Sequence, residues 1–155
     1  MIPDLIEIGA PWKVLPEGIH PATLVEVETC FGTNPHRRGL FSGLVNALKA
    51  LRQAGCKTVY LDGSYVTGKP KPEDYDACWD VTGVIHANLD PVFLDFNLKR
   101  INQKLKYGGE FFPSTWLGVP GQTFLEFFQK DRFTGKAKGI LSIDLPTDPL
   151  LGRGK

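Results

Sequence analysis

The stretch LDGSYVTGKPKPEDYDACWD, residues 61–80, places a Gly-Ser pair nine residues ahead of an Asp-Tyr-Asp triplet. Its start belongs to KTVYLDG, a short β-branched and aromatic run that ends at a glycine and predicts a buried strand. Its end, within DYDACWDV, predicts a second strand, with parallel and antiparallel pairing both open. The loop between the two strands therefore decides which polar side chains meet.

The two acids of the triplet are predicted to point the same way. Residues two apart in a strand share a face, so Asp74 and Asp76 project together while Tyr75, Ala77 and Trp79 face the core. Two carboxylates this close repel each other, which raises the pKa of one unless a cation lies between them. Magnesium prefers a few carboxylate oxygens, water and substrate phosphates. The pair therefore predicts a magnesium site.

The Gly-Ser pair predicts an anion site beside these acids. Gly63 lets a phosphate approach the backbone, and the hydroxyl of Ser64 with the following N–H groups can hydrogen-bond it. Lys69 and Lys71, held forward by Pro70 and Pro72, can neutralise further phosphate charge. Together these residues predict a site for a metal and a nucleotide.

Composition bounds the architecture. The chain has 155 residues, of which 42% are hydrophobic and 23% charged, so we expect one globular domain over 1–155. Its proline-rich start predicts an extended lead-in over 1–18, and its turn-rich end predicts a frayed tail over 146–155. We find no signal peptide, no apolar run of the roughly 18 residues that a membrane span needs, and no paired cysteine spacing. We therefore expect a soluble, cytoplasmic protein with no membrane partner.

The remaining elements predict an α+β domain with a small mixed β-sheet packed with helices. Hydrophobic periodicity, caps and glycine stops predict helices over 21–31, 35–54 and 91–106, and strands at 110–112, 123–129 and 140–145. Arg37 and Arg38 are expected to be exposed at a helix start.

In the helix predicted after Asp90-Pro91, one face is apolar and the others are basic. We expect the apolar face to pack on the core; it comprises Leu94, Leu98, Ile101 and Leu105. The basic residues read as a solvated surface that could contact RNA phosphates; they are Lys99, Arg100, Lys104 and Lys106.

The spacing of Gly63-Ser64, nine residues, then Asp74-x-Asp76 resembles the signature of the DNA polymerase β-like nucleotidyltransferase superfamily. The resemblance covers about residues 58–80, and compatible flanking helices extend it to roughly 40–112. The form GSxxxG is also seen in minimal prokaryotic nucleotidyltransferases, some of which belong to toxin–antitoxin pairs. The segments LPEGIHPATL and TFLEFFQKD are similar to an uncharacterised bacterial family described only as nucleotidyltransferase-like.

The resemblance implies a role for each matching residue. Gly63 and Ser64 would hold the triphosphate of an NTP, and Asp74 and Asp76 would bind two Mg²⁺ ions. Lys69 would neutralise phosphate charge. The expected fold is nucleotidyltransferase-like.

A third carboxylate normally completes such a site and helps to activate the attacking hydroxyl. Glu110 has the expected position, after the helix that follows the Asp-x-Asp strand. Glu126, within a segment predicted to be a strand, is the alternative. Both stay open at this point, as does catalytic competence.

The resemblance implies Mg-dependent transfer of a nucleoside monophosphate from an NTP to a hydroxyl of a protein or RNA acceptor, with release of pyrophosphate. A cognate toxin or antitoxin is the implied partner. The alternative is a catalytically inactive binding module of the same fold, such as an antitoxin or a regulatory subunit. A phosphoesterase-like hydrolase that uses the same acids is a third option.

Overall fold

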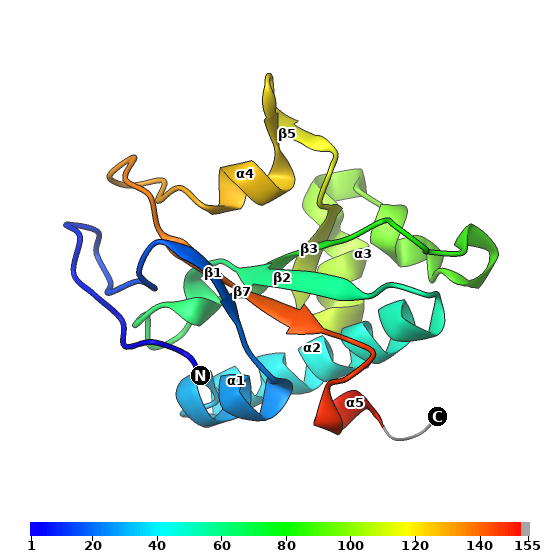
Figure 1. Cartoon of the computed structure of the whole chain (residues 1–155), viewed down its shortest axis with the longest axis horizontal. Coiled ribbons are helices and arrows are strands. Elements are labelled where there is room, and N and C mark those ends of the chain that lie inside the picture. The colour runs from blue at the N-terminus through cyan, green and yellow to red at the C-terminus, as the bar shows by residue number, and fades with distance from the viewer. Residues whose placement is uncertain (153–155) are drawn as a thin grey trace.

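A mixed β-sheet forms the centre of the structure, a computed structural model that describes residues 1–152 (Figure 1). The main sheet has five strands in the order β1-β7-β2-β3-β4, and a separate two-stranded sheet pairs β5 with β6. The strands are β1 (Gly18–Pro21), β2 (Thr58–Asp62), β3 (Tyr75–Trp79), β4 (Gly109–Pro113), β5 (Leu117–Val119), β6 (Gln122–Thr123) and β7 (Gly139–Asp144). The α-helices are α1 (Leu24–Phe31), α2 (Pro35–Gln53), α3 (Asn97–Tyr107), α4 (Phe124–Phe128) and α5 (Pro149–Gly152). Short 3-10 turns are η1 (Ser64–Val66), η2 (His86–Asn88) and η3 (Pro91–Leu94).

Strand pairing in the main sheet is of both kinds, which confirms the predicted α+β class with a mixed sheet packed with helices. Strand β2 lies antiparallel to both β3 and β7. Strand β1 is parallel to β7, and β3 is parallel to β4. The open question of how the two strands around residues 61–80 pair is thereby answered: they are antiparallel.

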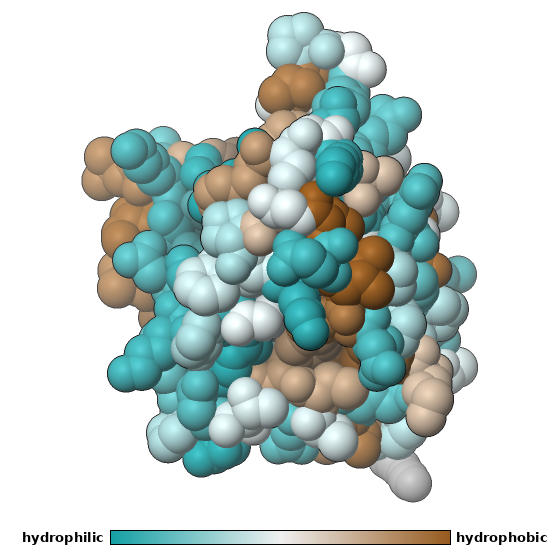
Figure 2. Space-filling view, turned by 90° about the vertical axis from the view of Figure 1, so that its left-hand side faces the viewer, coloured by the Kyte–Doolittle hydropathy of each residue, from teal (hydrophilic) through white to brown (hydrophobic). Residues whose placement is uncertain are grey.

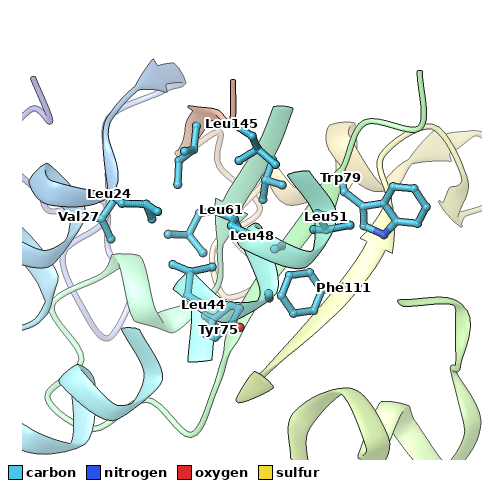
Figure 3. Packing of buried hydrophobic residues seen from close by; sticks show 14 of the residues in the cluster. Leu24, Val27, Leu44, Leu48, Leu51, Leu61, Tyr75, Trp79, Phe111 and Leu145 are labelled. Atoms are coloured by element: carbon cyan, nitrogen blue, oxygen red, sulfur yellow. The ribbon is translucent and has the colours of Figure 1, made fainter. Parts of the chain in front are cut away.

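Helix α2 is the main cover of one face of this sheet, as predicted. Asn34 caps it by accepting a hydrogen bond from the N–H of Arg37, and Pro35 is its first residue. Its apolar stripe packs with α1 against the strands, as Figure 3 shows for Leu44, Leu48 and Leu51 of α2 beside Leu61, Tyr75 and Phe111 of the sheet. This face of the sheet is filled by hydrophobic side chains, so polar side chains of the strands are left to the opposite face.

The segment before α1 differs from the expectation. We predicted a helix from Pro21, but Pro21 ends β1 and the helix begins at Leu24, after its cap Thr23. Pro21 pairs with Ser142 of β7, and the cap Thr23 lies two residues further along the chain. The chain is therefore still a strand at Pro21, and the helix starts only after Thr23. Earlier in the lead-in, Ile6 and Val14 form an isolated antiparallel bridge.

The end of the chain also differs from the predicted frayed tail. Helix α5 lies within it, and Leu151 is buried. The carboxylate of Asp148 accepts hydrogen bonds from the N–H groups of Leu24 and Leu150, which joins the tail to the start of α1. Residues 153–155 of the predicted tail lie outside the described residues.

The strand predicted over 123–129 is wrong. Thr123 forms a capping box with Glu126, and Phe124–Phe128 are the helix α4. The order of apolar and polar residues in this segment fits a strand as well as a helix. The Thr-x-x-Glu capping box and two aromatic rings four residues apart both favour a helix. The rings of Phe124 and Phe128 pack over the sheet face that α2 leaves open, against Cys78 and Phe112.

The helix predicted over 91–106 is divided, and the part of its apolar stripe that lies in α3 faces outward. Leu98–Arg100 have positive φ values of 49°, 56° and 62°, so the chain turns between η3 and the rest of α3. Leu98 is 83% exposed and Leu105 is 77% exposed. The expectation that the stripe packs on the core is therefore wrong for Leu98, Ile101 and Leu105, whereas Leu94 is partly buried and packs against the core.

Gln103 explains the orientation of α3. Its side chain is fully buried, and its amide oxygen accepts a hydrogen bond from the N–H of Phe111 at 2.7 Å. Its amide nitrogen donates to the carbonyls of Val92 and Phe111 at 3.0 and 3.2 Å. These bonds attach α3 to β4 by its polar face, because buried backbone groups need partners.

This orientation predicts that replacing a polar residue of α3, Gln103, lowers the stability more than replacing an apolar one, Leu105. Gln103→Leu leaves the N–H of Phe111 buried without a partner and should lower the free energy of unfolding by about 2–3 kcal/mol. Leu105→Ala, two residues along the same helix, should change it by less than about 0.5 kcal/mol. Urea unfolding followed by circular dichroism measures both values, and a larger loss for Leu105→Ala would refute the orientation of α3.

Candidate functional site

Three carboxylates lie side by side on the sheet face opposite α2. Asp62 on β2 is the register partner of Asp76 on β3, and Asp76 is the partner of Glu110 on β4. Register partners project to the same side, so these three residues form a row across three strands, here called the acid row. Asp74 lies one residue before β3.

The Gly-Ser corner meets the acid row directly. Gly63 has a φ of 87°, a conformation that glycine adopts readily. A Cβ at this position would lie 2.9 Å from the backbone N of Asp76 and 3.0 Å from its Oδ2. Ser64 follows and begins η1. The backbone at position 63 can lie this close to Asp76 because glycine has no side chain.

A buried arginine shapes the loop behind this corner. Arg37 is 3% exposed, which shows that the expectation of an exposed residue is wrong. Its guanidinium donates to the carbonyls of Phe31, Tyr65 and Thr67 at 3.1, 2.7 and 3.0 Å, and also to that of Lys69. Burial lowers the pKa of Arg37, which still leaves it charged because the ordinary value is so high.

Two more residues at the start of α2 hold the same loop. The amide of Asn34 donates to the carbonyl of Pro70 at 2.9 Å, and Nε2 of His36 pairs with that of Pro72. We call Asn34, His36 and Arg37 the clamp. One signal in the sequence could have revealed it: cations are unfavourable at the N-terminus of a helix unless they have other partners.

The clamp and the corner lie on the left of Figure 1, near the lead-in. Figure 2 looks onto this side, and its hydrophobic patches are interrupted by hydrophilic surface.

Asp76, at the centre of the row, is electrostatically the least satisfied carboxylate. Its Oδ1 is buried and has no hydrogen-bond partner. Burial raises the pKa of Asp76 well above its ordinary value, and the charges of Asp62, Asp74 and Glu110 raise it further. Burial, followed by the charge of Glu110, also raises the pKa of Asp74. The site therefore has an excess of negative charge at its centre.

Cations compensate the two outer members of the row. Lys138 forms an ion pair with Asp62 and donates to the carbonyl of Phe128 at 2.9 Å. Burial still raises the pKa of Asp62, although Lys138 opposes the shift. Glu110 is held by Arg100 at 2.9 Å and by Lys104 at 3.2 Å.

The pKa of Glu110 moves the other way. Its burial opposes ionisation, but the hydrogen bonds and charges of Arg100 and Lys104 outweigh this and lower the pKa. Neither the compensating cations nor Asp62 is part of the sequence motif.

Of the residues predicted from the sequence, the structure brings most together. One region holds Gly63, Asp74, Asp76 and Glu110. The charge of Lys69 opposes the rise in the pKa of Asp74, so Lys69 belongs to the same region. Glu126 does not join them. It is exposed on α4, where its carboxylate accepts a hydrogen bond from the N–H of Thr123 at 2.9 Å. Between the two candidates for a third acid, only Glu110 is in the row.

One comparison identifies a family. The chain belongs to DUF6932, a family of unknown function. The model of that family matches residues 10–144, which include the whole main sheet and the acid row. Searches of curated proteins and of solved structures find no match.

In this DUF6932 chain, the donor set suits a hard divalent cation in type, because all its donors are carboxylate oxygens. The buried, unpaired Oδ1 of Asp76 also fits a missing cation. Over residues 1–152, however, no three His, Cys, Asp or Glu side chains are arranged so that they could hold a metal ion together. Asp62 and Glu110 point their oxygens at lysine and arginine instead.

None of the helices within residues 1–152 is long and apolar enough to cross a membrane.

The clamp predicts a contrast between neighbouring arginines. Arg37→Met should lower the free energy of unfolding by about 3 kcal/mol, because several buried carbonyls lose a charged donor. Arg38→Met, at an exposed position, should change it by less than about 0.5 kcal/mol. Chemical denaturation tests both variants, and equal effects would show that the clamp does not hold the loop.

The raised pKa of Asp76 predicts that this residue weakens the fold at neutral pH. A carboxyl whose pKa is raised on folding binds more protons in the folded state, so its contribution to stability falls as pH rises through that range. In buffer with EDTA, Asp76→Asn should therefore raise the melting temperature at pH 7.

The gain should shrink as the pH falls toward about 3, where the wild-type carboxyl is mostly protonated in both the folded and the unfolded state. Thermal unfolding across this range measures it. A gain that is independent of pH, or a loss at pH 7, would contradict the assigned electrostatics.

Proposed function

We propose that this protein is a magnesium-dependent nucleotidyltransferase that transfers a nucleoside monophosphate from an NTP to a hydroxyl of an acceptor. A nucleotidyltransferase-like fold is part of the proposal. The observation that supports it best is the meeting of Gly63 with Asp76 and Glu110 on one sheet face, although Glu110 is far away in sequence. The spacing motif and the spatial arrangement thus agree at independent positions.

The Gly-Ser corner would hold the triphosphate. Gly63 has no side chain to obstruct it, and the hydroxyl of the half-buried Ser64 has no hydrogen-bond partner among the described side-chain bonds. Lys69 extends from a loop that Arg37 fixes through the backbone of that same lysine. The clamp fixes the backbone at Lys69, which supports a role for this lysine in neutralising phosphate charge.

Asp74, Asp76 and Glu110 would hold two Mg²⁺ ions after a rearrangement, because in their present positions no three such side chains within residues 1–152 could hold a metal ion together. When bound, Mg²⁺ would lower the pKa of the acceptor hydroxyl and stabilise charge on the phosphates. A cation beside Asp76 also removes the cost of its buried, unpaired Oδ1. To take part, Glu110 must exchange its contacts with Arg100 and Lys104 for the reacting groups.

In the proposed reaction the acceptor oxygen forms a bond to the α-phosphorus, and the bond between the α-phosphorus and the bridging oxygen to the β-phosphate breaks. Pyrophosphate leaves, and the hydroxyl proton passes to a base, for which Glu110 is the candidate. Release of Glu110 from Arg100 and Lys104 would remove the contacts that lower its pKa, and its carboxylate would then be a stronger base.

One observation favours the alternative, an inactive binding module such as an antitoxin or a regulatory subunit. Lys138 and Arg100 already neutralise the outer carboxylates, and such ion pairs can hold the fold together without any metal. In that case the acid row is structural, and a cognate toxin or antitoxin would be bound elsewhere on the surface.

Transfer of label from an α-labelled NTP distinguishes these functions. With Mg²⁺ and a cell extract as the source of acceptors, the wild-type chain should label itself or a partner. Asp74→Asn with Asp76→Asn should abolish labelling, and Glu110→Gln should reduce it by about a hundredfold or more, since it removes the proposed base.

Glu126→Gln is the matched control, because it changes another glutamate outside the acid row and should leave the labelling rate unchanged. Release of free phosphate in place of pyrophosphate would favour the phosphoesterase. Absence of label, with partner binding that survives the double substitution, would refute the enzyme and support the binding module.

A further inference from the structure

A ladder of aromatic rings begins beside the acid row. Phe112 follows Glu110 by two residues on β4 and therefore projects to the same face. Phe96 lies parallel to Phe112 with ring centroids 6.1 Å apart and an interplanar angle of 3°. Trp116 lies against Phe96 at 5.8 Å. We call Phe96, Phe112 and Trp116 the aromatic wall.

The aromatic wall is closed on one side and open at its end. Phe124 of α4 stacks on Phe112 at 4.2 Å and closes the inner side. Trp116 is 49% exposed, and Phe96 is half-buried. In Figure 1, β5 and α4 project above the main sheet. A large ring held by neighbours but half exposed is a surface on which another flat ring can stack.

Arg100 joins the wall to the acid row. Its guanidinium carbon lies 5.3 Å from the ring centroid of Phe112 and its Nε bonds Glu110. Arg100 is also one of three consecutive residues in the left-handed region, a strained conformation for residues other than glycine. Such strain is characteristic of positions that the surrounding structure holds for a purpose.

The charge on α3 suits an anionic partner. Residues 97–107 carry four cations and no carboxylate. Arg100 and Lys104 pair with Glu110 and Lys106 pairs with Asp90, whereas none of the ion pairs within residues 1–152 involves Lys99. Lys99 is exposed, and the side chains of Lys104 and Lys106 are 33% and 56% exposed. Aromatic rings beside a basic helix are the combination by which proteins bind single-stranded nucleic acid.

An open hollow of about 710 Å³ continues from Phe96, between η3 and α3. Its polar lining is Asn97, Asn102, Lys106 and Asp95. Asn102 donates to Asp95 and Lys106 donates to Asp90, so a base or phosphate bound here would have to compete for these donors.

The order of the strands indicates which ligand would bind at the aromatic wall. Strand β2 carries the Gly-Ser corner, β3 carries Asp76, and β4 carries Glu110, with the wall beyond. A triphosphate at the corner would therefore lie on one side of the row and the wall on the other, next to the proposed base.

We propose that the aromatic wall binds the acceptor, and that the acceptor is the terminal nucleotide of a single-stranded RNA. The base stacks on Trp116 and Phe96, the cations of α3 contact the phosphates, and the terminal ribose presents its hydroxyls to Glu110. RNA fits better than DNA because its end has two neighbouring hydroxyls, and splayed RNA bases are characteristically read by stacking. This inference rests on the proposed function.

The test measures RNA binding without nucleotide or metal. Fluorescence anisotropy of a short, labelled RNA oligonucleotide of mixed sequence should show binding that weakens with added salt. Trp116→Ala should raise the Kd about tenfold, whereas Trp116→Phe should recover most of the affinity because it keeps a ring. Phe133→Ala removes another exposed aromatic, outside the wall, and should leave the Kd unchanged.

The outcomes separate this inference from the proposed function. If Trp116→Ala weakens NTP binding and leaves RNA binding unchanged, the wall holds the incoming base and the inference is overturned, while the nucleotidyltransferase stands. Absence of RNA binding by the wild-type chain, or DNA binding at least as tight, also overturns it. RNA binding that needs Trp116, in a chain that transfers no label, supports the wall and refutes the enzyme.

Discussion

Crowding of carboxylates on one sheet face is the constraint around which this structure is arranged. Asp62, Asp76 and Glu110 occupy adjacent strands in register, a position in which like charges destabilise a sheet. The fold responds by bringing lysine and arginine to both ends of the row and leaving its centre uncompensated. The centre of the row therefore keeps a buried carboxylate oxygen without a partner, which costs stability.

The scaffold that permits this crowding is built on the other face. The leucines of α2 fill the core beneath the strands, and the start of the same helix fixes the loop that follows the Gly-Ser corner. One helix thus supplies both stability and the position of the loop that follows the Gly-Ser corner. Functional groups placed on such rigid supports keep their geometry without a ligand.

The sequence predicted the parts of the molecule whose signals are local. Helix α2, strands β2 and β3, and the pattern from Gly63 to Asp76 depend on periodicity, caps and spacing within a short window. Helix α4 was missed because the same five residues fit either period, and the orientation of α3 was missed because Gln103 contacts a strand that follows it. Membership of the acid row is likewise tertiary: register across β2 and β4 decides that Asp62 and Glu110 join it and that Glu126 does not.

The ammonium of Lys138 bonds a carboxylate of β2 and the last carbonyl of α4 at once. Whatever neutralises Asp62 therefore also alters the anchorage of the projecting arm formed by β5, β6 and α4. Thermodynamic reciprocity then requires that a molecule which restrains the arm changes the proton affinity of Asp62, and with it the pKa of that carboxyl. The two halves of the upper face are in this way energetically connected through a single nitrogen atom.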